Sequence, residues 1–267
     1  MIETPFNYTG SKFKLLEQIL PELDYTKECF IDLFTGGGSV YTNILDRYTK
    51  VISNDVISDL VGIHQSLLDN DDIITDTKSL CPIKGDSESF GLLRSNYNQN
   101  PTPSGLWALM LSSTNNMMRF NQKFKYNQTY GNRGWNPNTD KKVDIFKKHI
   151  RKYKDNIRFT SKTFNDFEIS SNKIMVYCDP PYKNSEAGYN AYWKNDDEDK
   201  LYEYLKKIDR FGSSFMISGV LSHNKVRSIL LDKLISDGYR YKELNFNYNK
   251  VSRVGKKETT EVIIMNY

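Results

Sequence analysis

A short apolar segment that leads through glycines into a helical pattern constrains the fold of this chain more than any other stretch. Residues 30–34 read Phe-Ile-Asp-Leu-Phe, glycines occupy 36–38, and a helical pattern runs from Ser39 through Arg47. A strand, a glycine turn and a helix form half of a βαβ unit and let the backbone approach a ligand. The turn lacks G-x-G-x-x-G and the Lys-Ser/Thr end of a phosphate-binding loop, which favours an adenosine compound without phosphates.

Further apolar segments alternate with helical ones along the chain. We expect strands at 50–53, 156–160, 173–178 and 214–218, and a terminal hairpin at 241–248 and 261–265. Helical patterns cover most of 57–112 and return at 201–208 and 226–234. This alternation predicts an α/β fold with a mostly parallel sheet and an antiparallel C-terminal end.

The strand expected at 173–178 ends at Asp179, Pro180, Pro181 and Tyr182. The prolines fix φ and remove two backbone donors, so the carbonyls of Asp179 and Pro180 are held outward. A carboxylate and a carbonyl on one side suit a flat group with an amine: both accept its N–H bonds while Tyr182 stacks on the ring. The alternative is an ordinary loop with an exposed acid.

Two other segments carry candidate ligand contacts. Gly10 and Ser11 predict a turn and helix cap near Lys12, which favours a carboxylate ligand, although a plain helix start has the same pattern. Asp55 ends the second strand about 20 residues after the glycine turn, where an acid accepts ribose hydroxyls. Val56 would then lie against an adenine ring; the alternative is a turn that simply ends the strand.

Residues 113–140 are rich in Asn, Gln, Gly and aromatic side chains, few of which suit a core. Between Arg119 and Arg158 there are twelve Lys or Arg and three acids, although the whole chain has a net charge of +4. Concentrated positive charge suits a polyanion, and Arg, Asn and Gln read base edges. We interpret this segment as a nucleic-acid recognition element. A surface loop and, for 141–154, a solvated helix face are the alternatives.

Composition limits the remaining classes of protein. A chain of 267 residues suits one large α/β domain, or a core domain with an insertion. It has neither a long apolar run nor a signal peptide, so we expect a cytoplasmic protein that is not bound to a membrane. Three cysteines without a C-x-x-C pair and three scattered histidines predict reduced thiols and no metal.

The motifs in their order resemble a known enzyme family. N-Y-T-G-S-K, D-L-F-T-G-G-G-S, N-D, a basic insert and D-P-P-Y follow one another as in the Dam-type DNA adenine methyltransferases, the α class of amino-methyltransferases. The resemblance implies S-adenosylmethionine as cofactor, S-adenosylhomocysteine as product and a Rossmann-like catalytic domain. It assigns residues 1–56 and 155–267 to that domain and 57–154 to an inserted, mainly helical recognition domain.

Family roles can be carried over residue by residue. The implied cofactor contacts are Tyr8, Lys12, Phe34, Thr35 and Gly36 at the methionine end, Asp55 at the ribose, Val56 and Phe164 at the adenine, and Asp179. Asp179 to Tyr182 would hold the target base. The stretches N-N-M-M-R-F-N and Y-G-N-R look like the family's DNA-contacting stretches. They nominate Asn116, Arg119, Asn121, Tyr130 and Arg133, with Arg133 as the guanine reader. Ser113 and Thr114 stand where relatives often carry an aromatic wedge.

The resemblance implies a mechanism that the chemistry supports. The exocyclic nitrogen of adenine is a poor nucleophile, and accepting its hydrogens at Asp179 and Pro180 stabilises the charge that develops during in-line methyl transfer. The base must first be flipped out of double-stranded DNA. We expect a monomer or weak dimer, with GATC as the commonest target among look-alikes. Cytosine amine, RNA adenine and a non-catalytic DNA-binding relative are the alternatives; restriction-modification, phage and host settings stay open.

Overall fold

The computed structural model describes the whole chain except residues 7, 170, 182–191, 195, 225 and 246–258. Its centre is a sheet with the strand order β3-β2-β1-β4-β5-β8-β7, and β6 pairs with β5. The strands are β1 (Cys29–Asp32), β2 (Lys50–Asn54), β3 (Ile157–Thr160), β4 (Ile174–Cys178), β5 (Ser214–His223), β6 (Val226–Arg227), β7 (Arg240–Leu244) and β8 (Thr259–Met265). Strands β1 to β5 are parallel, whereas β8 is antiparallel to β5 and β7. The predicted mostly parallel sheet with an antiparallel end is confirmed.

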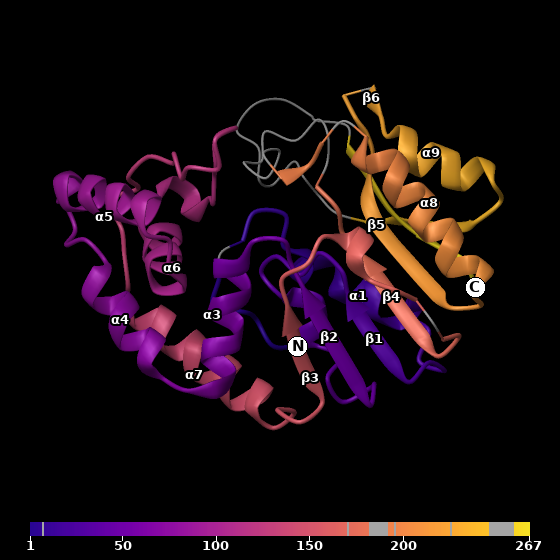
Figure 1. Ribbon diagram of the computed structural model, residues 1–267, viewed down its shortest axis with the longest axis horizontal. Coiled ribbons are helices and arrows are strands. Elements are labelled where there is room, and N and C mark those ends of the chain that lie inside the picture. Colours follow the sequence, from indigo (N-terminus) through magenta and orange to yellow (C-terminus); the bar gives the residue numbers. More distant parts are fainter. Residues whose placement is uncertain (7, 170, 182–191, 195, 225, 246–258) are drawn as a thin grey trace.

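Helices α3 to α7 lie beside the β3 edge of the sheet (Figure 1). The α-helices are α1 (Leu16–Ile19), α2 (Ser39–Thr42), α3 (Ser58–Asp69), α4 (Asp72–Leu80), α5 (Ser87–Gln99), α6 (Pro103–Ser112), α7 (Pro137–Arg151), α8 (Asp197–Arg210) and α9 (Ile229–Ser236). Helix α6 is buried almost throughout because α3, α4 and α5 pack around it, which explains its lack of a polar face. The predicted helical character of 57–112 is confirmed. No helix in the described ranges is long and apolar enough to cross a membrane.

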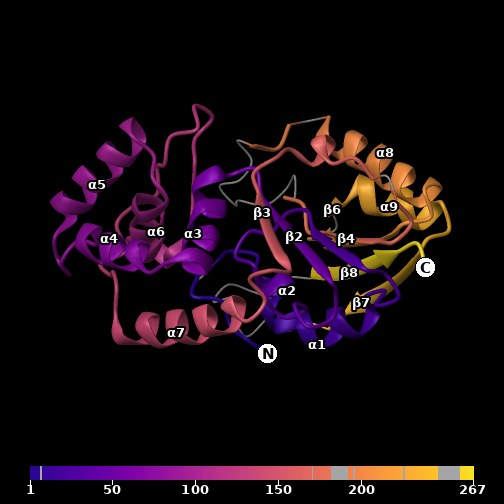
Figure 2. The same cartoon turned by 60° about the horizontal axis from the view of Figure 1, so that its bottom comes forward.

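Both faces of the sheet are covered at its centre, so the central strands β1 and β4 are mostly apolar and buried, whereas the edge strand β7 is largely exposed. Ile31 and Val176 point into a core beneath α8 and α9. Their neighbours Phe30 and Met175 point into the core on the opposite face, which includes residues of α1 and α2. Figure 2 shows α8 and α9 on one side of the sheet and α1 and α2 on the other.

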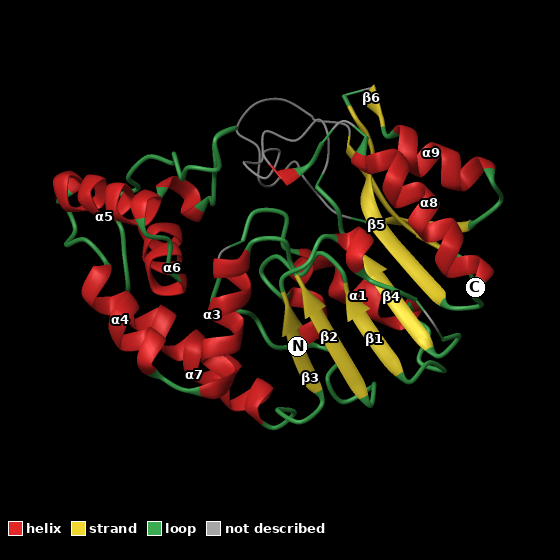
Figure 3. Ribbon diagram, viewed as in Figure 1, coloured by secondary structure: helices red, strands yellow, loops and turns green. Residues whose placement is uncertain are grey.

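The strand order creates a crevice at one edge of the sheet. The chain runs from β1 outward through β2 to β3 and then returns to the other side of β1 as β4. Connections therefore leave β1 and β4 in opposite directions, which is where α/β sheets bind ligands. Strands β1 to β4 point to the same edge (Figure 3), so the glycine turn, Asp55 and Asp179 all lie there.

Two predicted helices differ from those observed. The helix after the glycine turn ends at Thr42 and is followed by turns. The Asn43 side-chain amide ends it by donating hydrogen bonds to the carbonyl oxygens of Ser39 and Ile2, at 2.9 Å each. The last helix begins at Ile229, and Val226, which was assigned to it, lies in β6 instead. At the N-terminus, two short 3₁₀-helices, Lys12–Leu15 and Leu20–Glu22, flank α1.

Candidate active site

A pocket of about 410 Å³ lies at the edge where strands β1, β2 and β4 end. Its volume is within the roughly 300–1,000 Å³ of small-molecule sites. The predicted site residues that line it are Tyr8, Lys12, Phe34, Thr35, Gly36, Asp55, Val56, Phe164, Asp179, Pro180 and Pro181. Tyr182, predicted to stack on the target base, lies outside the described residues. The fold therefore brings these predicted site residues together around one pocket.

The glycine turn after β1 packs closely against Tyr8. Gly36 has a φ of 50° and Gly38 a φ of 79°, values that residues other than glycine rarely adopt. A Cβ on Gly36 would lie 2.7 Å from Cε1 of Tyr8, and one on Gly37 would lie 2.6 Å from its Cβ. Glycine is required here for Tyr8 to keep its place on the pocket wall.

Asp55 links the end of β2 to the glycine turn. Its Oδ2 accepts a hydrogen bond from the Gly36 N–H at 2.9 Å, and its Oδ1 accepts one from the Ile57 N–H at 3.0 Å. Burial raises the pKa of the Asp55 carboxyl, and these backbone N–H groups oppose the rise. Because a carboxylate offers about four acceptor positions, Asp55 can also accept hydroxyl groups from a ligand.

Asp179 is held by Lys12 directly after β4. Nζ of Lys12 lies 2.7 Å from Oδ1 and 2.8 Å from Oδ2 of Asp179, so the ammonium group contacts both oxygens. Ser218 donates to Oδ1 at 3.1 Å, and its hydroxyl also pairs with that of Tyr177 at 2.7 Å. The Asp179 side chain is nevertheless 18% exposed and lines the pocket, so an incoming amine can reach it.

Glu261 in β8 is a site residue that the sequence analysis missed. Its Oε1 lies 3.4 Å from Nζ of Lys12, and both side chains are only 5% exposed. Lys12, predicted at the methionine end of a cofactor, therefore lies between two carboxylates. An acid directly before the apolar run 262–265 was the available signal, because a buried carboxylate requires a partner.

Three aromatic rings form one wall of the pocket. Phe34 and Phe164 have ring centroids 5.8 Å apart, and Trp193 lies 5.7 Å from each of them. Val56, the other predicted adenine contact, is 41% exposed and lines the same pocket. The buried Nε1–H of Trp193 has no hydrogen-bond partner within the described part of the chain. An apolar wall with an unused donor suits a flat heterocycle such as adenine.

His64 of α3 is a second group that the sequence analysis missed. It is fully buried, with Nε2 at 3.1 Å from the Gly36 carbonyl and Nδ1 at 2.9 Å from the Tyr41 hydroxyl. A neutral ring that donates from Nε2 and accepts at Nδ1 satisfies both contacts. Burial lowers the pKa of His64 to about 4. Helix α3 therefore supports the glycine turn through the contact of His64 with the Gly36 carbonyl.

The lowered pKa of His64 makes stability depend on pH in a defined direction. Between pH 6.5 and 4 the unfolded chain binds a proton that the folded chain does not, so stability falls as pH falls through this window. We expect the free energy of unfolding in urea to drop by about 2 kcal/mol more between pH 7 and pH 5 in wild type than in His64→Gln. Gln retains a donor and an acceptor. Equal pH dependence in both proteins would contradict this assignment.

The predicted DNA contacts lie in the segment between α6 and α7, and their environments differ. Arg119 and Arg133 are exposed, and Arg133 donates from Nη1 to Oδ1 of Asn116 at 2.8 Å. Asn116 is buried and donates to the backbone carbonyls of Met110 and Leu111. Its geometry therefore suits orienting Arg133 better than contacting a base.

Two further nominated residues have structural partners. Oδ1 of Asn121 accepts hydrogen bonds from the N–H groups of Lys123 and Lys125, which forms a tight turn. The Tyr130 hydroxyl donates to the Ile83 carbonyl at 3.1 Å. Most Asn, Gln and aromatic side chains of 113–140 are exposed or half-buried, as expected, but Asn116, Phe120, Tyr126 and Gln128 are buried in a small core. Polar composition concealed this small core.

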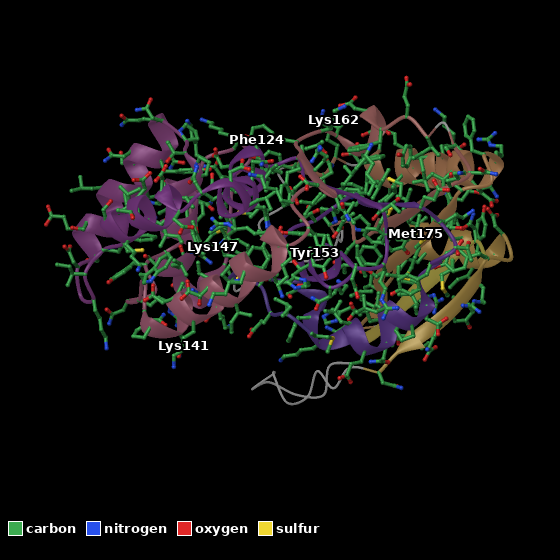
Figure 4. The ribbon with its side chains drawn as sticks, turned by 90° about the horizontal axis from the view of Figure 1, so that it is seen from below. Phe124, Lys141, Lys147, Tyr153, Lys162 and Met175 are labelled. Atoms are coloured by element: carbon green, nitrogen blue, oxygen red, sulfur yellow. The ribbon has the colours of Figure 1, made fainter. Side chains whose placement is uncertain are left out.

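The basic residues of α7 lie away from the pocket. Lys147 and Arg151 both pair with Asp71, and Lys142 pairs with Glu3. Figure 4 shows Lys141 and Lys147 along α7, which lies at the lower edge of Figure 1, whereas the pocket-forming ends of the strands point upward. The helix-face alternative therefore accounts for this part of the charge excess.

The His, Cys, Asp and Glu side chains are the potential metal ligands of the chain, and one cysteine lies beside Asp179. Among the described residues, no group of three or more of these side chains could hold a metal ion. Cys178, next to Asp179, is fully buried in β4, and burial raises the pKa of its thiol well above the usual value. It is packed as a small residue within the strand.

Comparison with known proteins finds DNA methyltransferases and modification methylases. The model of the D12 class N6 adenine-specific DNA methyltransferase family matches residues 8–252. The chain is 30% identical over its full length to the modification methylase StsI of Streptococcus sanguinis and to the type II methyltransferase M.FokI of Planomicrobium okeanokoites, and covers 43% of each. A DNA adenine methylase of Serratia marcescens is 27% identical, over 70% of each chain. The chain thus spans less than half the length of the first two relatives.

Proposed function

Because this chain belongs to the D12 class N6 adenine-specific DNA methyltransferase family, we propose that it transfers a methyl group from S-adenosylmethionine to the exocyclic amine of adenine in DNA. One observation carries the proposal. The Asp179 carboxylate, held by Lys12, lines the same pocket as Asp55 and the glycine turn. An amine acceptor and an adenosine-type site therefore share one cavity.

The pocket fits the cofactor that the family implies. S-adenosylmethionine supplies an electrophilic methyl group when bound and leaves as S-adenosylhomocysteine. Asp55 would accept the ribose hydroxyls, and Val56 and Phe164 would flank the adenine. Trp193 packs on Phe164 in the same wall, where its unused N–H can donate to the ring. Tyr8, Lys12, Phe34, Thr35 and Gly36 would hold the methionine end, where Lys12 also contacts Asp179 and Glu261.

Asp179 and Pro180 supply the chemistry on the target base. The Asp179 carboxylate and the Pro180 carbonyl would accept the two hydrogens of the exocyclic amine, which favours a pyramidal nitrogen with an available lone pair. The two contacts of Lys12 with Asp179 and the hydrogen bond from Ser218 fix the carboxylate before the substrate arrives. Catalysis then depends mainly on positioning for in-line attack.

The proposal also assigns the two parts of the chain to different tasks. Residues 1–56 and 155–267 form the catalytic part, and 57–154 form the target-recognition part. The Dam-type subclass, base flipping and a short duplex target, GATC among the expected motifs, follow from the resemblance of the ordered motifs. Similarity to modification methylases favours a role beside a restriction enzyme.

Transfer of labelled methyl groups to different acceptors tests the proposal. We expect label from S-adenosylmethionine to enter unmethylated bacterial duplex DNA and not RNA of matched length. Label in RNA alone would move the activity to another nucleic acid. DNA binding without any transfer would favour a non-catalytic relative.

Arg133 provides a test of sequence reading. An exposed Arg oriented by Asn116 can donate two bonds to guanine, so Arg133→Ala should reduce discrimination at one motif position by about 1–3 kcal/mol. Methylation of a set of duplexes that vary at each motif position measures this effect. Arg47→Ala removes an exposed Arg just before the start of β2, at the opposite edge of the sheet, and should leave discrimination intact. Unchanged discrimination in Arg133→Ala would show that another residue reads the guanine.

A further inference from the structure

Two consecutive aromatic residues connect the pocket with residues 113–140, called the recognition segment here. Trp193 contacts Phe34 and Phe164 in the pocket wall, as described above. Its neighbour Tyr192 also lines the pocket, but its ring faces the recognition segment, 5.7 Å from Phe120 and 4.8 Å from Phe124 between centroids. Phe120, Phe124, Tyr192 and Trp193 are called the aromatic bridge below.

Phe124 occupies an unusual position at the tip of a tight turn. The turn is closed by hydrogen bonds between Asn121 and residues Phe124 and Lys125, and by a bridge between Phe120 and Tyr126. Phe124 has a φ of 55°, in the left-handed region that favours glycine, and it is 51% exposed. A bulky residue in this conformation costs free energy, and such outliers cluster at functional sites.

The charge around Phe124 indicates what this turn meets. Lys123 and Lys125 flank it in the sequence and are both exposed, and Nζ of Lys125 also donates to the Asn98 carbonyl. Exposed lysines beside an aromatic ring suit the phosphate backbone of DNA. A DNA duplex bound at these lysines would contact the turn whose Phe120 and Phe124 pack against Tyr192.

We propose that the aromatic bridge couples DNA binding to cofactor binding. DNA held at Lys123 and Lys125 stabilises the turn, and the turn fixes Tyr192. Tyr192 in turn fixes Trp193 against Phe34 and Phe164 in the pocket wall. Tyr192 is thus a positioning residue. The inference rests on the proposed function, because it requires both a DNA partner and an adenosine cofactor. Coupling of this kind is reciprocal, so the cofactor would also tighten DNA binding.

Phe124→Gly separates this role from structural support. Glycine relieves the left-handed strain, so the thermal unfolding midpoint should equal or exceed that of wild type. The dissociation constant of S-adenosylhomocysteine is measured by calorimetry, without DNA and at saturating duplex DNA. We expect wild type to bind it at least about fivefold more tightly with DNA. Phe124→Gly should bind it equally well with and without DNA, and Phe124→Tyr, which keeps the ring, should behave as wild type.

Two outcomes would overturn the inference: wild-type protein gains no S-adenosylhomocysteine affinity from DNA, or Phe124→Gly keeps the whole gain at saturating DNA. If in the second case Phe124→Gly also binds DNA more weakly, Phe124 is a DNA contact only. If wild type binds S-adenosylhomocysteine neither with nor without DNA, the proposed function itself fails, and that result differs from loss of coupling.

Discussion

Replacing Asp179 with Ala is expected to abolish methyl transfer while cofactor binding persists. The variant loses the charged acceptor for the target amine, and removal of one such electrostatic group typically lowers kcat by about 10²–10³-fold or more. Asp179 is one of the implied cofactor contacts, but the Asp55 and glycine-turn contacts are untouched, so most of the affinity for S-adenosylhomocysteine should persist. Single-turnover transfer and calorimetry measure the two effects.

A second variant protects this test against misfolding. Asp179→Ala leaves Lys12 with Glu261 at 3.4 Å, and Asp179→Asn keeps the side-chain shape if that change proves disruptive. Glu22→Ala serves as the control, because it removes a carboxylate that pairs with Arg240 and Lys242 at the outer edge of the sheet. Near-normal turnover of both Asp179→Ala and Asp179→Asn would contradict the proposed role of Asp179 as acceptor for the target amine.

Asp55→Ala is expected to have the opposite profile, with a large loss of cofactor affinity. The change removes the ribose acceptor and leaves the N–H groups of Gly36 and Ile57 without their partner, which also loosens the glycine turn. Hydrogen bonds to charged groups contribute roughly 1.5–3 kcal/mol each, so affinity should fall by about 100-fold or more. Calorimetric titration of S-adenosylhomocysteine measures the loss.

Asp59 offers a matched control for Asp55. It is a half-buried carboxylate in α3 that accepts a hydrogen bond from the Tyr97 hydroxyl at 2.7 Å and does not line the pocket. Asp59→Ala should therefore bind cofactor as wild type does. If Asp55→Ala folds, by circular dichroism, and binds cofactor with wild-type affinity, Asp55 is not the ribose ligand.

Much of the fold and pocket could be predicted because parallel sheets turn chain order into geometry. The carboxyl ends of parallel strands meet at one edge, so side chains that follow β1, β2 and β4 converge without detailed packing information. That rule placed Thr35, Asp55 and Asp179 around one cavity. Continuous apolar runs likewise indicated strands that are buried on both faces.

Contacts made by tertiary packing could not be predicted in this way. His64 reaches the Gly36 carbonyl because α3 packs behind the glycine turn, and no local pattern encodes that distance. Glu261 meets Lys12 only because β8 inserts beside β5. The excess of basic residues suggested one DNA surface, whereas much of α7 pairs with acids from the N-terminus and from Asp71 between α3 and α4.

The most direct test of adenine methylation is the identity of the modified nucleoside. Unmethylated plasmid DNA is incubated with the protein and S-adenosylmethionine, digested to nucleosides and analysed by mass spectrometry. We expect N6-methyladenine nucleoside, formed by wild type and absent with Asp179→Ala. N4-methylcytosine in place of methyladenine, or no methylated nucleoside from a folded protein that binds the cofactor, would contradict the assignment of adenine as the target of Asp179.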